Sequence, residues 1–269
     1  MLDPEKIKER CNRRPQTREI AREVLLFDSV DSTNRIALEM ASMGVPGGMV
    51  ILAEAQEKGR GRLGRAWFSP KGVNLYLSLL LRPYQESREL PLFSLATSVA
   101  LVKAIEAETG LAPRIKWPND VLVNDKKVAG ILLESESDGA QTPSLVIGIG
   151  VNVNMEADDF PPELRPIATS LKTALGKQID RDDLLIALLD ALADQFLLLE
   201  EGKKGLLIES VNRYSQTLGK KVRVDTPRQA FEGWAEEIEE DGALRIRLGD
   251  GSRRKIMVGD ITHLREIKN

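Results

Sequence analysis

Apolar residues recur along this chain with the spacing of helices in three places. In residues 90–109, LPLFSLATSVALVKAIEAET, they recur at intervals of three and four, which predicts a long buried helix. Residues 180–202 show a similar period, with acidic residues in the first turn where they suit the helix dipole. A third helix is predicted after DSTN, where Asp31 or Ser32 can cap it, and it ends at Gly44.

Shorter apolar runs between these helices predict strands. One pair reads as a hairpin, VLV and KVAGILLE around a polar NDK turn, and the run LVIGIGVNVN is too apolar to face water on either side. From about Gly219 the chain changes to short strands separated by turn residues, which is typical of a small barrel-like β-domain. The earlier strands are expected in residues 50–55, 74–81, 121–123, 127–134 and 145–154.

Composition narrows the function classes. The chain has 269 residues, enough for one large domain or a large and a small one, and a formal net charge of −3 argues against a general nucleic-acid-binding surface. Cys11 is the only cysteine and His263 the only histidine, which excludes an internal disulfide and a Cys/His zinc site. Any Ser-His-Asp or Cys-His catalysis would depend on His263, which is expected to be a solvated surface residue. With no signal peptide and no membrane span, a soluble cytoplasmic protein is expected, without nucleic-acid or membrane partners.

The stretch EKGRGRLGRAWFSP, residues 57–70, satisfies the G-x-G-x-x-G pattern of dinucleotide-binding folds. In those folds the glycines open a helix, and an acidic residue about 20 positions later binds ribose. Here Pro70 and Gly72 break any helix, and the region about 20 residues on, LLLRPY, has no carboxylate. The lysine and hydroxyl residue of a phosphate-binding P-loop are also missing. The arginines themselves must therefore supply positive charge.

Three polar stretches follow apolar elements and are candidates for one anion-binding site. In the first, Arg60, Arg62 and Arg65 can make bidentate contacts to carboxylate or phosphate; the alternative is a solvated charged loop. Trp67 and Phe68 either stack on a base or belong to the core.

In the second stretch, Asn119 and Asp120 follow Trp117-Pro118, and a carboxylate there can hold a magnesium ion or a ribose hydroxyl. The alternative is an ordinary turn into the hairpin. Lys127, at the start of an apolar strand, is either a functional cation or a lysine that blocks strand pairing at an edge.

The third stretch places Gly148 and Gly150 in a strand suited to deep burial, where glycine often marks the close approach of a ligand. Asn152 can hydrogen-bond that ligand; the alternative is a packing glycine pair and a turn asparagine. The residues thus predict an anion site suited to adenylate-type chemistry, but they do not name a substrate.

Taken together, GRGRLGRAWFSPKGVNLYLSLLLRP, RIKWPNDVLVNDKKVAGILLE and IGIGVNVN resemble the three signature regions of biotin protein ligases (biotin–[acetyl-CoA-carboxylase] ligases). DSVDSTN resembles the early biotin-contacting segment of that family. The resemblance runs from about Leu26 to the end, with the motifs in order. It implies an α+β fold like that of class II aminoacyl-tRNA synthetases, with a mixed, largely antiparallel sheet, packed helices and a small C-terminal SH3-like β-barrel.

The resemblance also implies a two-step reaction. The carboxylate of biotin attacks the α-phosphate of ATP, accompanied by Mg²⁺, to give biotinyl-5′-AMP and pyrophosphate. A specific lysine of a biotin carboxyl carrier domain of a carboxylase then takes the biotinyl group as an amide. A glycine-rich loop that folds over the adenylate would hide it from water.

The site residues implied by the resemblance fall into two groups, with Lys127 and Arg62 as the catalytic residues. Lys127 matches the lysine that contacts both the biotin carboxylate and the phosphate without forming a covalent intermediate, and no metal ligand is assigned. The positions matching biotin contacts are Ser32, Thr33, Gln56, Gly59, Arg60, Lys127, Gly130, Gly148 and Gly150. The positions matching contacts to the nucleotide or its metal are Arg62, Arg65, Trp67, Asn119, Asp120 and Asn152.

The expected organisation is a polar helical lead-in at residues 1–24, a catalytic domain at 25–217 and the C-terminal domain at 218–269. Many bacterial members carry an N-terminal DNA-binding domain and act as repressors. Because only about 25 residues precede the ligase core, repression is not expected. A homodimer is implied by the resemblance. One alternative is a lipoate or octanoate ligase or transferase, which is distinguished from a biotin ligase by the group that it attaches to an acceptor. The other is a biotin sensor or DNA-binding regulator, which a gel shift with DNA would reveal.

Overall fold

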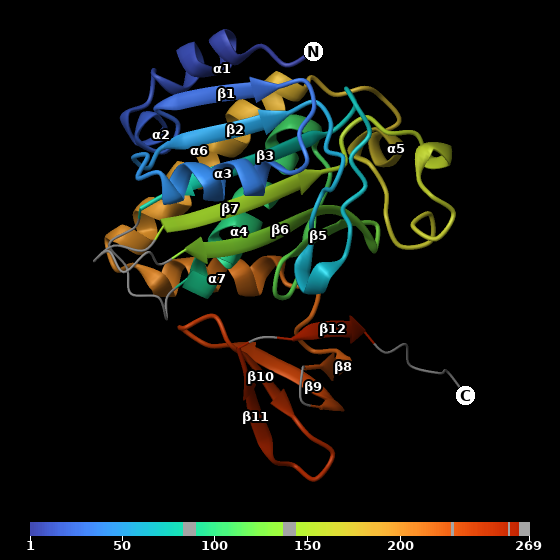
Figure 1. The fold of residues 1–269 in the computed structure, drawn as a ribbon. Coiled ribbons are helices and arrows are strands. Elements are labelled where there is room, and N and C mark those ends of the chain that lie inside the picture. The colour runs from blue at the N-terminus through green and yellow to red at the C-terminus, as the bar shows by residue number, and fades with distance from the viewer. Residues whose placement is uncertain (83–89, 137–143, 227–228, 258, 264–269) are drawn as a thin grey trace.

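A computed structural model describes residues 1–82, 90–136, 144–226, 229–257 and 259–263. The chain forms a seven-stranded mixed sheet flanked by helices, and a separate five-stranded antiparallel sheet at its C-terminal end (Figure 1). The predicted α+β fold is confirmed.

The larger sheet has the strand order β1-β2-β3-β7-β6-β5-β4. Only β1 and β2 are parallel, so the sheet is largely antiparallel as expected. Every residue of β3 is buried, and β7 is buried along almost its whole length. This confirms the prediction that the run LVIGIGVNVN, which contains most of β7, faces water on neither side. The strands are β1 Glu23–Phe27, β2 Met49–Ala53, β3 Leu75–Leu81, β4 Arg114–Lys116, β5 Asp120–Val123, β6 Lys126–Glu136 and β7 Ser144–Val151.

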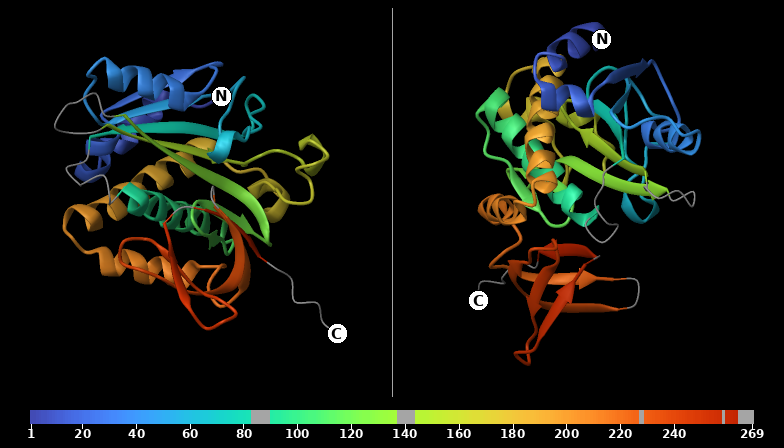
Figure 2. Two further views of the ribbon diagram at one scale, coloured as in Figure 1. Left: turned by 60° about the horizontal axis from the view of Figure 1, so that its bottom comes forward. Right: turned by 90° about the vertical axis from the view of Figure 1, so that its left-hand side faces the viewer.

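Helices cover both faces of this sheet (Figure 2). The long helices α4 (Leu90–Thr109) and α6 (Arg181–Glu200) pack against each other on one face, while α3 (Thr33–Ser42) lies on the other. Successive residues of β2 therefore join different cores: Val50 packs toward α4 and α6, and Ile51 toward α3. The three predicted helices are confirmed. None of the helices in the described ranges is long and apolar enough to cross a membrane.

The N-terminal lead-in forms two short helices that belong to the main body. Asp3 caps α1 (Pro4–Cys11) by accepting hydrogen bonds from two backbone amides, and Pro15 begins α2 (Pro15–Ile20). Cys11 is fully buried in the main core, and burial raises the pKa of its thiol to about 11. The remaining helices are α5 Leu171–Leu175 and α7 Lys204–Tyr214, with short 3₁₀ turns at Arg62–Gly64 and Ala157–Asp159.

The C-terminal sheet has the order β11-β10-β9-β8-β12 and is antiparallel throughout. Trp117 connects it to the main body, because its buried indole N–H donates to the carbonyl of Gly242 at 3.0 Å and its backbone N–H donates to Thr217 Oγ1 at 3.1 Å. The domain boundaries at residues 24 and 217 remain a proposal. The strands are β8 Lys221–Asp225, β9 Ala230–Ile238, β10 Leu244–Arg247, β11 Arg253–Ile256 and β12 Asp260–His263.

A buried ion pair joins the N-terminus, the sheet and α6. Glu54, directly after β2, has a side chain only 2% exposed, and its Oε2 lies 2.8 Å from Nη1 of Arg181 in the first turn of α6. Arg181 also donates to the carbonyl of Asn74 at 3.0 Å, and Leu2 N–H donates to Glu54 Oε1 at 2.7 Å. Burial by itself raises the pKa of Glu54, but hydrogen bonds from Arg181 and Leu2 and nearby positive charge outweigh it, so the pKa is lowered.

We expect Glu54→Gln to destabilise the fold strongly, because it leaves the buried Arg181 guanidinium without a counter-charge. The free energy of unfolding at pH 7 should fall by about 3–5 kcal/mol in urea titrations. Because the pKa of Glu54 is lowered in the folded state, its stabilisation is present above the ordinary pKa of 4.5 and is lost as the pH falls through the folded-state pKa. The free energy of unfolding of Glu54→Gln should therefore lack this decrease at acid pH. The control is Glu9→Gln, which removes an exposed pair with Arg13; equal costs for the two variants would contradict the expectation.

Candidate functional site

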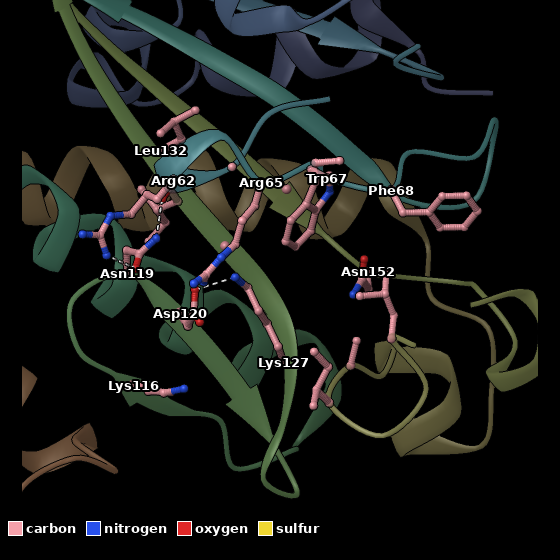
Figure 3. A pocket seen from close by; sticks show the side chains of 18 of the residues that line it. Arg62, Arg65, Trp67, Phe68, Lys116, Asn119, Asp120, Lys127, Leu132 and Asn152 are labelled. Carbon is pink, nitrogen blue, oxygen red and sulfur yellow. Dashed lines mark hydrogen bonds and ion pairs between the residues drawn. The ribbon is translucent and has the colours of Figure 1, made fainter. Parts of the chain in front are cut away.

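One cavity of about 940 Å³ lies where the loop after β2, the β4–β5–β6 segment and the end of β7 meet (Figure 3). It brings together all but one of the residues singled out from the sequence. The predicted residues that line it are Ser32, Thr33, Gln56, Arg60, Arg62, Arg65, Trp67, Asn119, Asp120, Lys127, Gly130, Gly148, Gly150 and Asn152.

Gly59 is the exception, and it lies at the base of the arginine loop, residues 59–66. Its carbonyl accepts a hydrogen bond from the backbone N–H of Trp67 at 2.9 Å, and a Cβ at this position would overlap the Trp67 carbonyl oxygen. Gly59 thus allows the two ends of the loop to approach closely, and it does not line the cavity.

The arginine loop is a tight hairpin. Arg60 and Ala66 form an antiparallel bridge, Gly61 N–H donates to the Arg65 carbonyl at 2.7 Å, and between them lies a single 3₁₀ turn. Leu63 adopts a left-handed conformation with φ of 55°, which non-glycine residues rarely do. These glycines open no helix of the dinucleotide-binding kind, as the sequence analysis expected.

The arginines of the loop pair with fixed partners on other elements. Arg62 donates to Asn119 Oδ1 at 3.0 Å and to the carbonyl of Gly259 at 3.4 Å, and it lies 3.6 Å from Asp260 of β12. Arg65 forms an ion pair with the same Asp260, and Arg60 lies 3.5 Å from Glu134 of β6. The alternative of a solvated charged loop is therefore wrong for Arg62, whose side chain is only 20% exposed, although Arg65 is mostly exposed.

Lys127 enters the cavity from a β-bulge. The pairing of β5 with β6 shifts register at this point, so that Val121 faces Ala129 while Leu122 faces Lys127. The ammonium lies 2.6 Å from Asp120 Oδ1 and 5.3 Å from the centre of the Trp67 ring (Figure 3). The backbone of Lys127 hydrogen-bonds to Ile167 and Thr169, so the alternative of a lysine that blocks edge pairing is wrong.

Asn119 fastens the arginine loop to the sheet. Its amide nitrogen donates to the carbonyl of Ile131 at 2.8 Å, its backbone carbonyl accepts from Ile131 N–H at 3.0 Å, and its Oδ1 accepts from Arg62. Asn119 and Asp120 thus do more than form an ordinary turn. One holds Arg62 and the other holds Lys127.

A buried polar network forms one wall of the cavity. Gln56 Oε1 accepts from the backbone N–H of Thr33 at 2.9 Å, and Ser78 Oγ lies 2.8 Å from Thr33 Oγ1 and 2.5 Å from Asn34 Oδ1. Asn34 in turn donates to Glu134 Oε2 at 2.7 Å. Ser32 occupies the N-cap position of α3, but its side chain makes no capping hydrogen bond and lines the cavity instead.

Three glycines make the facing part of the sheet flat. Gly130 and Gly150 are directly paired between β6 and β7, and Gly148 lies two residues away. A Cβ on Gly150 would overlap the Trp67 indole, one on Gly130 would lie 3.0 Å from it, and one on Gly148 would overlap the Asn34 amide. The indole nitrogen of Trp67 is buried without a hydrogen-bond partner. Trp67 therefore lies on this glycine floor inside the cavity. Phe68 also lines the cavity, although it is 41% exposed and belongs to neither core cluster.

Asn152, just after β7, lines the cavity and is hydrogen-bonded within the protein. Its side chain donates to the carbonyl of Thr169 at 3.2 Å and its backbone N–H donates to Val128 at 2.8 Å, so both groups are already bonded within the protein.

Sequence reasoning missed several residues that line the cavity. Asn34 and Lys116 lie within stretches that were recognised, DSTN and RIKWPND, but neither was singled out there. Asp260 and His263 belong to none of the recognised stretches. The expectation that His263 is a solvated surface residue is wrong. It is half-buried and lies 3.2 Å from Thr217 Oγ1, and burial, reinforced by the charges of Lys220 and Lys116, lowers the pKa of its imidazole to about 4.

The carboxylates of the site serve as counter-ions to its cations. In the part of the chain that the structure describes, no group of three or more His, Cys, Asp or Glu side chains is arranged to hold a metal. Glu134 and Asp260 are in ion pairs with arginines of the loop, and Asp120 is in an ion pair with Lys127. The site can thus hold an anionic ligand whose phosphates replace these carboxylates.

Comparison with protein families assigns both parts of the chain. Residues 26–152 match the Biotin/lipoate A/B protein ligase family, and residues 217–264 match the Biotin protein ligase C terminal domain.

Individual relatives cover most of the chain. It is 36% identical to the bifunctional ligase/repressor BirA of Bacillus subtilis (strain 168), over 91% of this chain and 75% of that protein. It is 35% identical to the biotin–[acetyl-CoA-carboxylase] ligase of Paracoccus denitrificans, over 86% of this chain and 96% of that protein. Among solved structures, the biotin protein ligase of Aquifex aeolicus in complex with biotin and ATP superposes with a TM-score of 0.78 at 30% identity, covering 91% of this chain and 99% of that chain.

The glycine floor predicts a steric test of the site's architecture. Gly148→Ala would push the Asn34 amide away from Ser78 and Glu134, so we expect the melting temperature in scanning calorimetry to fall by about 2–10 °C. The control is Gly205→Ala in α7, where an added Cβ meets nothing within 4 Å and the variant should be as stable as the wild type or slightly more so. An unchanged melting temperature for Gly148→Ala would mean that the network tolerates the displacement.

Proposed function

Because this chain belongs to the biotin/lipoate A/B protein ligase family, we propose that it activates biotin with ATP and transfers it to a lysine of a biotin carboxyl carrier domain. It is an enzyme of the ligase class. The observation that carries the proposal is the cavity in which an arginine loop and Lys127 meet a glycine floor, in a fold shared with a ligase solved with biotin and ATP.

The lipoate alternative is not favoured. Although the family matched by residues 26–152 includes lipoate ligases by name, residues 217–264 match a domain specific by name to biotin protein ligases, and the relatives are named as biotin ligases.

The first chemical step joins two anions. An oxygen of the biotin carboxylate attacks the α-phosphorus of ATP, the bond from that phosphorus to the β-bridging oxygen breaks, and pyrophosphate leaves with the electron pair. Arg62, Arg65 and Lys127 line the cavity where this charge develops. Asp120 and Trp67 hold the Lys127 ammonium beside the glycine floor, so the ammonium is preorganised to contact both the carboxylate and the α-phosphate.

The polar wall and the glycine floor suit the other end of biotin. Ser32, Thr33 and Gln56 present hydroxyl and amide groups at this wall of the cavity. The Trp67 indole, which occupies the space over Gly150, offers an apolar ring system a flat surface to pack against. We assign biotin to this end of the cavity and the nucleotide to the end that holds Arg62, Arg65 and Asn119.

The second step forms an amide. The neutral ε-amine of the acceptor lysine attacks the carbonyl carbon of the adenylate, the bond from that carbon to the phosphate oxygen breaks, AMP leaves with the electron pair, and the amine loses a proton to solvent. The arginine loop is proposed to cover the adenylate until then, since it is anchored at both ends and lies over the cavity. Mg²⁺ is proposed to enter with the nucleotide as part of the substrate, bound mainly by phosphate oxygens. The homodimer and the cytoplasmic location remain predictions.

Acceptor labelling tests the function directly. The purified chain is incubated with Mg-ATP, biotin or lipoate, and a biotin carboxyl carrier domain, and the acceptor is read by intact mass. We expect a gain of one biotinyl group that requires ATP and is absent with lipoate. A lipoyl gain would assign the sister activity, and no gain despite tight biotin binding would indicate a sensor. Without acceptor, native mass spectrometry should find the adenylate still bound; its release into solution would contradict the proposed cover by the arginine loop.

Lys127→Ala should slow adenylate formation by about a hundredfold or more, because a preorganised positive charge at the reacting oxygens is lost. The melting temperature should stay near that of the wild type, since the Lys127 side chain is partly exposed. Lys126→Ala is the matched control, because its ammonium contacts the Arg165 carbonyl at 2.9 Å outside the cavity, and it should keep normal rates. Near-normal adenylate formation by Lys127→Ala would remove Lys127 from the mechanism.

A further inference from the structure

The cavity continues past Lys127 to a second end between the main body and the C-terminal sheet. We call this part the interdomain end and define it by the residues from three separate segments that line it. They are Lys116 at the end of β4, Gln216 and Lys220 before β8, and Thr262 and His263 in β12.

Two lysines of the interdomain end have no partner for their ammonium groups. Within the described ranges, neither Lys116 nor Lys220 makes a side-chain hydrogen bond or an ion pair, although both side chains are partly buried. The cations nearer the arginine loop do have anionic partners: Arg62 and Arg65 pair with Asp260, and Lys127 pairs with Asp120. Partly burying unpaired ammonium groups costs free energy, which a bound anion would offset.

The electrostatics of neighbouring groups agree with this imbalance. Burial lowers the pKa of Lys116, and the charges of Lys127 and Arg65 lower it further against the opposing effect of Asp120 and Asp260. The imidazole of His263 is neutral at pH 7, because burial and the charges of Lys220 and Lys116 outweigh the opposing effect of Asp125 on its pKa. Asp125 also lines the cavity here and accepts a hydrogen bond from Gln216, so two ammonium groups stand against one carboxylate and the interdomain end carries a net positive charge before any ligand arrives.

We propose that the interdomain end is an oxyanion subsite in which Lys116 and Lys220 bind the β- and γ-phosphates of the nucleotide and then the departing pyrophosphate. The identity of this anion rests on the proposed function. Thr262 adds a hydroxyl from the C-terminal sheet, so the site for the leaving group is complete only when that sheet is docked.

The division of charge within one cavity supports this assignment. In the first step, Lys127 and the arginines act at the carboxylate and the α-phosphate, while negative charge grows on the oxygen that leaves with pyrophosphate. Cations at a separate position are needed to receive that charge. Lys116 on β4 is paired in register with Asp120 on β5, and Asp120 is the counter-ion of Lys127. The charge of Lys116 therefore lies close to the reacting centre, although Lys116 itself is not part of the Lys127–Asp120 ion pair.

Titration of the full chain with inorganic pyrophosphate tests the subsite without turnover. We expect Lys116→Gln to weaken pyrophosphate binding in calorimetry by about ten- to a hundredfold and to raise KM for ATP in a similar proportion. Biotin affinity should change by less than about twofold, which is within the error of such measurements. Lys116→Arg should retain most of the affinity, and Lys103→Gln, an exposed lysine on α4, is the matched control.

Equal pyrophosphate affinities for Lys116→Gln and Lys103→Gln would overturn the proposal, as would an equal loss of biotin and pyrophosphate binding. If Lys116→Gln fails to fold, Lys220→Gln carries the test, with a smaller but selective loss of pyrophosphate binding expected and unchanged binding contradicting it. Wild-type protein that binds pyrophosphate but labels no acceptor would refute the proposed function and leave the anion subsite in place.

Discussion

The buried contact between Glu54 and Arg181 fixes the frame on which the candidate site is built. Glu54 directly follows β2, two residues before Gln56, and the Arg181 guanidinium donates to the carbonyl of Asn74, one residue before β3 begins. The chain between these points contains the whole arginine loop. The backbone N–H of Gly72 also donates to the carbonyl of Glu54 at 3.1 Å, so the two ends of the segment 54–74 are held together. The arginine loop within this segment is therefore held at a defined position over the sheet.

On this frame, the site solves an electrostatic problem that any enzyme joining two anions must face. Several cations have to lie within one cavity before the substrate is present, and they repel one another unless counter-charges separate them. Asp120 and Asp260 provide that separation from two different sheets. The phosphates of a nucleotide present the same kind of anionic oxygen ligand as these carboxylates, so the cations of the site are already arranged to contact such oxygens before the nucleotide binds.

The sequence predicted the long elements and the motif residues well, because helical and strand periods and short motifs are local signals. The helix at 90–109 needed only its apolar spacing, and the glycines at 148 and 150 were marked by their place in a buried strand. What it missed depends on contacts between distant positions. Asn34 matters because it reaches Glu134, a hundred residues on, and Asp260 matters because it meets Arg62 across the interface between the two sheets. The bulge that turns Lys127 into the cavity is likewise a property of strand register, and no residue in the hairpin marks it.

The hydrogen bond from Arg62 to the carbonyl of Gly259 gives the C-terminal sheet a mechanical connection to the chemistry. Trp117 and Gly242 hold that sheet at one point, and Arg62 and Asp260 hold it at a second. Arg62 thus belongs both to the lining of the cavity and to the contact between the two sheets. A ligand that draws Arg62 toward itself would weaken one of the contacts that hold the C-terminal sheet against the main body.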